Sequence, residues 1–175
     1  MAGKAEIRAR MRAPRRALSA EERRAASLGV CARLSAMDLA RPIAVYLATA
    51  DEIDLSAFIV KALADGKVLA APRWNGSGYE LARLEGLDGK FLRRGPMGVL
   101  EPRSDEIFPP ATIGAWIVPG LAFTADGRRI GYGGGWYDRM LEGVCAPKIG
   151  VAYPFQILED LPSLEHDVRL DTVVF

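Results

Sequence analysis

The spacing of apolar positions predicts two helices near the start of the chain. The first is expected over residues 3–12 and is interrupted or ended at Pro14, because proline lacks the N–H that continues a helix. Ser19 and Glu22 form a capping-box pattern, which predicts a second helix that runs to about Met37. Apolar residues recur at helical spacing along it and predict its buried stripe: Ala25, Leu28, Cys31, Leu34 and Met37.

Short apolar runs bounded by turn residues predict strands between further helices. Strands are expected over residues 43–48, 67–72, 79–84, 116–118, 148–153 and 171–175. Helices are expected over 55–64 and from about 135 to 141, and the Gly- and Pro-rich stretch 86–110 predicts mostly loop. This alternation predicts an α/β protein, a three-layer α/β/α arrangement around a mostly parallel, mixed sheet, in one domain over residues 1–175.

The charge balance narrows the class of partner. The 175 residues carry 23 basic and 22 acidic side chains, for a net charge of +1. That balance argues against a general nucleic-acid or membrane-surface binder. Basic residues are nevertheless concentrated between Lys4 and Arg24. Such a run is typical of a solvated helix face, and a segment that faces phosphate is the alternative.

Cysteine content and hydropathy favour a cytoplasmic protein. Cys31 and Cys145 lie far apart, which indicates a reducing compartment without a disulfide framework or thiolate metal site. Apolar runs fall short of the roughly 18 residues needed to span a bilayer. The Arg-rich start lacks the apolar core of a signal peptide, and acidic residues interrupt it, which disfavours the alternative of an organellar transit segment.

The stretch 118–139 carries the strongest chemical signal in the chain. Glycines at four of the five positions 131–135 follow Arg128 and Arg129, and Asp138 comes shortly after. Backbone N–H groups in such a turn form a concavity for anions, and a following helix start adds positive partial charge. A carboxylate oxygen suits the Mg²⁺ that accompanies a nucleotide. The pattern therefore predicts a phosphate site.

Several common motifs are excluded. Walker A needs Lys and then Ser or Thr after its last glycine, but Trp136 follows Gly135. A dinucleotide fingerprint that starts at Gly131 would need glycine at position 136, so a nicotinamide oxidoreductase is disfavoured. The one histidine, His166, is expected to be a surface or capping residue, which leaves a Ser-His-Asp hydrolase poorly supported.

The same stretch closely resembles the signature of the 5-formyltetrahydrofolate cyclo-ligases, also called methenyltetrahydrofolate synthetases. Their pattern reads roughly Val-Pro-Gly-x-Ala-Phe-Asp-x-x-Gly-x-Arg-Leu-Gly-x-Gly-x-Gly-Tyr-Tyr-Asp-Arg. Further segments also resemble the family, so the likeness extends over nearly the whole chain: 4–8, 48–54, 71–73, 98–102 and 171–174. The chain departs from the pattern at Thr124, where the family usually has Asp, and at Trp136, where it usually has Tyr.

The resemblance implies an ATP-dependent ring closure of 5-formyltetrahydrofolate to 5,10-methenyltetrahydrofolate, with release of ADP and phosphate. ATP, a co-substrate used with Mg²⁺, would phosphorylate the formyl oxygen, and N10 of the folate would then attack the activated carbon. Such chemistry depends mainly on positioning and charge neutralisation. We expect a monomer with a small-molecule substrate and no nucleic-acid or membrane partner.

The resemblance also assigns roles to individual residues. ATP contacts are expected from Lys4, Arg8, Arg129, Gly131, Tyr132, Gly133, Gly134, Gly135, Trp136 and Tyr137. Folate contacts are expected from Leu47, Glu52, Tyr132, Gly133, Gly134, Gly135 and Trp136. Arg129, Tyr132 and Gly133 are expected to be catalytic, and Asp138 and Asp171 to be Mg²⁺ ligands.

Residue chemistry supports two of these assignments. Lys4 and Arg8 stand four apart on a predicted helix, so their side chains share one face. A carboxylate at Glu52 can accept hydrogen bonds from the donor-rich edge of a reduced pterin.

Two alternative functions stay open on the sequence. An enzyme of another class on a similar framework, such as a sugar-phosphate isomerase or CoA transferase, would leave the Gly-rich loop unexplained. This chain also shows no glutamate nucleophile in a recognisable context. A non-catalytic folate- or nucleotide-binding paralogue is kept open by Thr124.

Overall fold

The central layer is a mixed β-sheet in the computed structural model, which describes residues 3–164 and 167–175. Over these residues, seven strands pair in the order β11–β10–β7–β1–β2–β3–β6. Their bounds are β1 Ile43–Ala44, β2 Leu69–Trp74, β3 Tyr79–Leu84, β6 Ile107–Phe108, β7 Ala115–Val118, β10 Lys148–Val151 and β11 Thr172–Val174. The five strands from β11 to β2 pair in parallel, whereas β3 and β6 pair antiparallel. The predicted mixed, mostly parallel sheet is confirmed.

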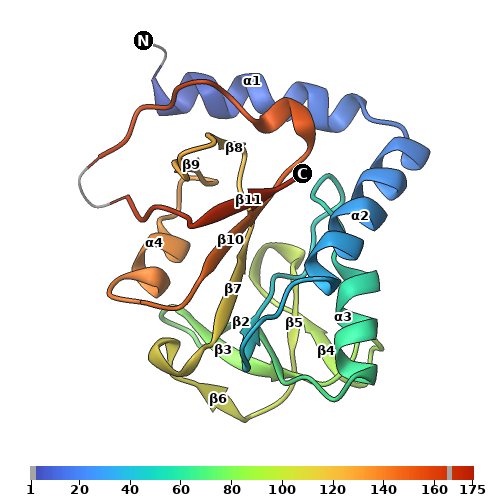
Figure 1. The fold of residues 1–175 in the computed structure, drawn as a ribbon. Coiled ribbons are helices and arrows are strands. Elements are labelled where there is room, and N and C mark those ends of the chain that lie inside the picture. The colour runs from blue at the N-terminus through green and yellow to red at the C-terminus, as the bar shows by residue number, and fades with distance from the viewer. Residues whose placement is uncertain (1–2, 165–166) are drawn as a thin grey trace.

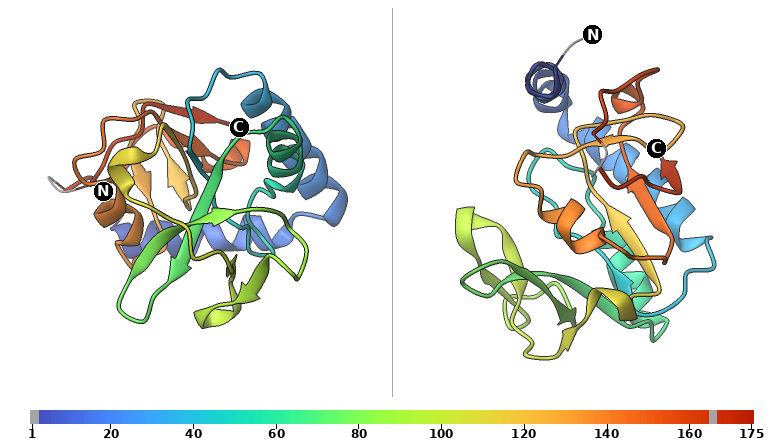
Figure 2. Two further views of the ribbon diagram at one scale, coloured as in Figure 1. Left: turned by 90° about the horizontal axis from the view of Figure 1, so that it is seen from below. Right: turned by 90° about the vertical axis from the view of Figure 1, so that its left-hand side faces the viewer.

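Helices cover both faces of this sheet. Helices α2 (Ala20–Ser35) and α3 (Ser56–Ala64) lie on one face, and α4 (Trp136–Leu141) lies on the other (Figures 1 and 2). Successive side chains of a strand point to opposite faces. In β7, Ile117 accordingly packs in the cluster that contains α2 and α3, while its neighbours Trp116 and Val118 pack with α4. The expected three-layer α/β/α class is confirmed.

Helix α1 (Lys4–Ala17) packs on a β-hairpin at one end of the sheet (Figure 1). The hairpin consists of β8 (Ala122–Phe123) and β9 (Arg129–Ile130). Ile7 and Met11 of α1 are buried against it in a separate cluster with Leu121, Ala122 and Ile130. This packing brings the basic N-terminal helix to the Gly-rich stretch that follows β9.

Two helix predictions need correction. Helix α1 continues through Pro14 to Ala17. Proline at this position lies in the last turn and removes a single ladder bond. On α2, Leu28 is 49% exposed and Ala25 is also exposed. The buried stripe instead contains Ser27, whose hydroxyl accepts a hydrogen bond from the Asp54 N–H at 2.9 Å, with Val30, Cys31 and Leu34.

The stretch 86–110 is mostly loop, as predicted, but it also contains three short strands that the sequence did not predict. Strands β4 (Leu92–Arg94) and β5 (Leu100–Pro102) pair as a small separate sheet, and β6 joins the edge of the main one. Buried Glu101 holds β5 in place, because its carboxylate accepts bonds from Arg93 Nε at 2.9 Å and Trp74 N at 2.8 Å. Short strands stabilised by such distant contacts leave little periodicity in the sequence.

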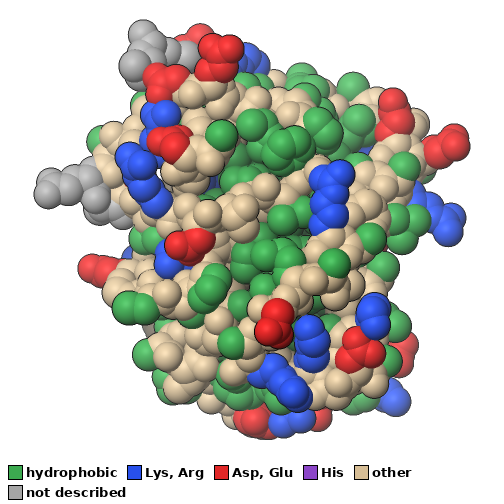
Figure 3. Space-filling view, in the orientation of Figure 1, with side chains coloured by type: hydrophobic (Ala, Val, Ile, Leu, Met, Phe, Trp, Pro, Cys, Tyr) green, Lys and Arg blue, Asp and Glu red, His purple; other side chains and the backbone are tan. Residues whose placement is uncertain are grey.

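The remaining described elements are 3₁₀ turns: η1 Pro96–Gly98, η2 Pro110–Thr112 and η3 Pro154–Gln156. Among the helices that the structure describes, none combines the length and apolarity needed to cross a membrane. Acidic and basic side chains are intermixed on the face seen in Figure 3, in keeping with the balanced net charge.

Candidate functional site

A cavity of about 1000 Å³ opens at the carboxyl ends of the parallel strands. Tyr46 and Leu47 line it just after β1, and Pro119 lines it just after β7. This edge of a parallel sheet is where ligands bind in open α/β folds. The cavity collects most residues that the sequence singled out: Lys4, Arg8, Leu47, Glu52, Arg129, Gly131, Tyr132, Gly133, Gly134, Gly135, Trp136, Tyr137 and Asp138.

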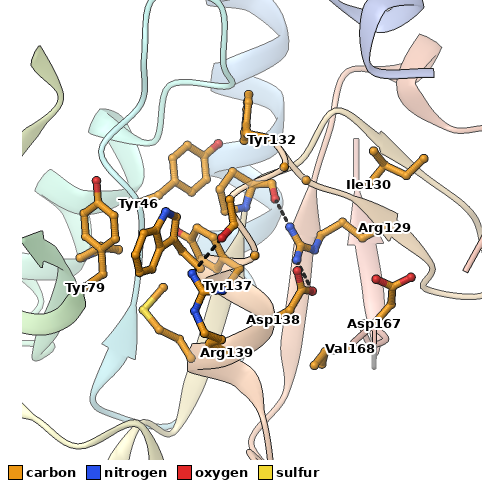
Figure 4. A pocket seen from close by; sticks show the side chains of 18 of the residues that line it. Tyr46, Tyr79, Arg129, Ile130, Tyr132, Tyr137, Asp138, Arg139, Asp167 and Val168 are labelled. Carbon is orange, nitrogen blue, oxygen red and sulfur yellow. Dashed lines mark hydrogen bonds and ion pairs between the residues drawn. The ribbon is translucent and has the colours of Figure 1, made fainter. Parts of the chain in front are cut away.

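Three cationic residues lie at one end of the cavity, which we call the charged end. Arg129, with a side chain 3% exposed, donates from Nη2 to Asp138 at 2.7 Å. Lys4 Nζ donates to both carboxylate oxygens of Asp167, at 2.5 and 2.7 Å. Arg8 Nε donates to the Gly131 carbonyl at 2.9 Å. Figure 4 shows Arg129, Asp138 and Asp167 together on this side of the pocket.

Asp171 lies elsewhere. It is not among the cavity's lining residues, and its carboxylate accepts a bond from Lys148 N at 2.7 Å. Because Asp171 precedes β11 and Lys148 begins β10, this contact lies at the amino edge of the parallel strands, opposite the cavity. The structure therefore does not bring Asp138 and Asp171 together.

Asp167 is a carboxylate at the charged end that sequence reasoning missed. It lines the cavity with Asp138, yet its partner Lys4 is 163 positions away in the chain. It lies in an irregular segment that gives no periodic signal, and neighbouring His166 lies outside the described residues. Over the described residues, no group of three His, Cys, Asp or Glu side chains is arranged to hold a metal. Two carboxylates still suit Mg²⁺, which usually keeps waters and binds phosphate oxygens.

Arg128 and Arg129 separate at the start of β9, although the sequence presents them as a pair. Adjacent residues of an extended chain point to opposite sides. Arg129 lines the cavity, whereas Arg128 forms ion pairs with Asp126 and Asp160 outside it. The phosphate prediction therefore applies to Arg129.

The loop 131–135 passes along the cavity with little side-chain cover. Gly133 has φ +106° and Gly135 has φ +65°, backbone conformations that other L-residues rarely adopt. A Cβ on Gly134 would lie 2.7 Å from the ring of Trp136. The glycines thus fix the path of the loop and leave its backbone open to a ligand.

Aromatic rings lie at the other end of the cavity, which we call the aromatic end. Trp74, Tyr79 and Trp136 meet edge to face, with ring centroids 5.3 to 5.4 Å apart. The Arg139 guanidinium lies 4.2 Å over the Trp136 ring. Tyr79 and Trp136 line the cavity. The sequence predicted a folate contact at Trp136 but not the contribution of the β2–β3 hairpin.

Glu52 lies in the loop between β1 and α3, with both carboxylate oxygens bound. Oε1 accepts a bond from the Tyr132 hydroxyl at 2.5 Å, and Oε2 accepts bonds from Thr49 N at 2.7 Å and Thr49 Oγ1 at 2.8 Å. Burial and the nearby Glu52 charge raise the pKa of both Tyr132 and Tyr137. Both hydroxyls therefore remain protonated donors near neutral pH.

Thr124 lies in the turn of the β8–β9 hairpin and does not line the cavity. Its Oγ1 donates to Asp126 Oδ1 at 2.5 Å and accepts from Arg128 N at 3.0 Å. Threonine therefore supplies the acceptor that a carboxylate at this position can supply to the turn. The replacement of the family's usual Asp by Thr124 therefore affects the hairpin turn and not the cavity lining.

Comparison with known proteins identifies the family. A model described as the 5-formyltetrahydrofolate cyclo-ligase family matches residues 1–175. A 5-formyltetrahydrofolate cyclo-ligase from Escherichia coli K12 is 30% identical over 173 residues, covering 94% of this chain and 95% of the relative. Its counterpart from Mus musculus is 27% identical over 185 residues, covering 97% and 91%.

Solved structures agree. The 5,10-methenyltetrahydrofolate synthetase of Aquifex aeolicus has a TM-score of 0.86 at 34% identity, covering 97% of this chain and 88% of the other. The synthetase of Mycoplasma pneumoniae has a TM-score of 0.76 at 25% identity, covering 97% and 96%. The chain therefore belongs to the 5-formyltetrahydrofolate cyclo-ligase family of enzymes.

Proposed function

We propose that the protein closes the ring of 5-formyltetrahydrofolate to give 5,10-methenyltetrahydrofolate, with conversion of ATP to ADP and phosphate. The observation that carries this proposal is the convergence of opposite chemistries on one cavity. Cations and an open glycine loop lie at the charged end, and Glu52 and a wall of aromatic rings line the rest. A triphosphate and a reduced folate need these two surroundings side by side.

The charged end would hold the phosphates of ATP. Lys4, Arg8 and Arg129 provide positive charge, and the loop 131–135 lets phosphate oxygens approach the backbone. Arg129 is the best placed to stabilise charge on the phosphoryl group in transfer, because burial strengthens its interactions.

Mg²⁺ fits the donor set at this end. Asp138 and Asp167 both line the cavity, and they replace the pair Asp138 and Asp171 as the proposed carboxylates. When bound, the ion would neutralise phosphate charge. Asp138 also keeps the Arg129 guanidinium oriented through their 2.7 Å contact.

The folate would lie along the rest of the cavity. Glu52 can accept hydrogen bonds from pterin N–H groups, and Leu47, Tyr79 and Trp136 offer apolar and aromatic surface to flat rings. Tyr132 and the glycine loop stand between the two ligands, in keeping with their expected contacts to both.

The protein would then promote the reaction mainly by holding the two ligands in position. The formyl oxygen takes the γ-phosphoryl group as the bond to ADP breaks, and N10 attacks the activated carbon. The new C–N bond forms as phosphate leaves and the N10 proton is released. Buried Arg129 and the backbone of Gly133 are the groups best placed to stabilise the transferring phosphoryl.

A turnover assay tests the proposal. Protein, Mg-ATP and 5-formyltetrahydrofolate should give a rise in near-ultraviolet absorbance from the methenyl product, with one ADP formed per product. Absence of both product and ATP consumption would overturn it. Tight folate binding without turnover would select the non-catalytic paralogue, an alternative that Thr124 no longer favours because it lies outside the cavity.

A further inference from the structure

Arg15 is a buried cation to which the proposed reaction gives no role. It lies in the last turn of α1, its side chain is 1% exposed, and it is not among the residues that line the cavity. Nε donates to the Asp51 carbonyl at 2.8 Å, and Nη1 donates to the Tyr132 hydroxyl at 2.7 Å. A buried guanidinium is costly unless its donors are bound, so these contacts define what it can do.

The Tyr132 hydroxyl passes this interaction on to Glu52. It accepts from Arg15 and donates to Glu52 Oε1 at 2.5 Å. A hydroxyl has one hydrogen to donate, and Arg15 can only donate, so the direction of the chain is fixed. The carboxylate that faces the folate is therefore oriented by a cation that does not touch the cavity.

Arg15 also holds the backbone of the same loop. Its bond to the Asp51 carbonyl precedes Glu52 by one residue, and Asp51 Oδ1 lies 3.4 Å from Arg15 Nη2. From the sheet side, the Tyr153 hydroxyl donates to the Glu52 carbonyl at 3.1 Å. Hydrogen bonds thus hold the loop from two sides, and those of Arg15 extend through Tyr132 to the side chain of Glu52.

We propose that Arg15 is a positioning residue for the folate, acting on Glu52 through the Tyr132 hydroxyl. The proposal rests on the proposed function, because it takes the ligand of Glu52 to be the folate. Helix α1 then contributes to both ends of the cavity. Its start places Lys4 and Arg8 near the phosphates, and its end orients the carboxylate of Glu52, which faces the folate. Loss of Arg15 should weaken folate binding and leave ATP binding nearly unchanged.

The first test compares Arg15→Met with Arg16→Met, a neighbouring control whose side chain is exposed. Calorimetry measures binding of 5-formyltetrahydrofolate without nucleotide, and binding of a non-hydrolysable ATP analogue without folate. Loss of one charge-assisted bond predicts a folate Kd raised about 10- to 100-fold in Arg15→Met. The analogue Kd and both Arg16→Met values should stay close to wild type. Equal weakening of both ligands would reveal a merely structural role and overturn the proposal.

A double-mutant cycle with Tyr132→Phe tests the route. If Arg15 acts mainly through the hydroxyl, Arg15→Met should raise the folate Kd by a clearly smaller factor in the Tyr132→Phe background than in the wild type. Additive effects would overturn the proposal. Should Arg15→Met fail to fold, Arg15→Lys takes its place in the cycle, because lysine keeps the charge but not the forked donors.

The wild-type assay separates the two levels of failure. A wild-type protein without turnover would defeat the proposed function. Normal wild-type turnover with an unchanged folate Kd in the Arg15 variants would defeat this inference alone.

Discussion

The two ends of the cavity are built in different ways. At the charged end, Lys4 and Arg129 are each bound to a carboxylate: Lys4 bonds Asp167 near the opposite end of the chain, and Arg129 bonds Asp138, nine positions further on. At the aromatic end, Trp74 and Tyr79 face each other across the turn of one hairpin, and Trp136 packs on both. One end depends on paired charges and the other on ring packing.

This difference teaches which ligand each end can bind. Paired charges in a cavity can exchange their partners for phosphate and a divalent ion, because both signs are already present. Ring surfaces gain little from a polyanion but bury flat apolar groups well. Substitutions at one end should therefore affect one ligand more than the other.

Removal of Arg129 should break the charged end most completely. We expect Arg129→Met to lower kcat about 100- to 1000-fold, the usual effect of deleting one group that stabilises transition-state charge. Arg128→Met is the matched control, since Arg128 pairs with Asp126 and Asp160 outside the cavity. It should lower the melting temperature and leave kcat at saturating substrates near wild type. Comparable losses of kcat in both variants would contradict the assignment to Arg129.

The next largest effects should be on the Mg²⁺ requirement, and they should distinguish the carboxylates at the charged end from Asp171. Asp138→Asn and Asp167→Asn should each raise the Mg²⁺ concentration needed for half-maximal turnover, by about 10- to 100-fold for a lost charged ligand. Asp171→Asn should leave that concentration unchanged, because Asp171 bonds Lys148 at the opposite edge of the sheet. Titration of turnover with Mg²⁺ measures all three. Shifts in Asp138→Asn and Asp171→Asn, with Asp167→Asn unchanged, would restore the pair expected from the sequence.

These carboxylates also show where sequence reasoning reaches its limit. The capping box at Ser19 and the alternating apolar runs predicted α2 and most of the sheet, because such signals are local. The residue pattern itself predicted the glycine loop, and the family resemblance added Lys4, Arg8 and Glu52. All of them line the cavity. Their chemical roles stay predictions.

What escaped prediction depends on contacts between distant residues. Asp167 is placed by Lys4 from the other end of the chain, and buried Arg15 reads in the sequence as part of an ordinary basic run. Strand β5 is held by the buried carboxylate of Glu101. Periodicity cannot reveal such pairings, because they depend on which residues meet in the fold and not on the spacing of residues along one segment.

Adjacent glycines offer a finer comparison of the two ends. Gly134→Ala places a Cβ 2.7 Å from the Trp136 ring, so the ring must move, and we expect the folate Kd to rise about 10-fold. Gly133→Ala has room, with Arg8 3.7 Å from the new Cβ, but its φ of +106° becomes strained, at about 1–3 kcal/mol. Relaxation of that strain should shift the loop and weaken ATP-analogue binding instead. Calorimetry with each ligand distinguishes the two, and identical profiles would argue against separate ends.

Thr124→Val should have the smallest effect on either end. The hydroxyl stabilises the hairpin turn, so its loss should lower the free energy of unfolding by about 1 kcal/mol for the bond from Arg128 N, while kcat stays near wild type. Bonding to Thr124 is the largest cause of the lowered pKa of Asp126. A carboxyl whose pKa is lower folded than unfolded stabilises the protein above its unfolded pKa of about 3.9, and that stabilisation is lost as pH falls. Denaturant unfolding of wild type and variant between pH 7 and about pH 3 should therefore show the gap between them narrowing in acid. A large loss of kcat would instead show that Thr124 contributes to the reaction, at the position where the family usually has Asp.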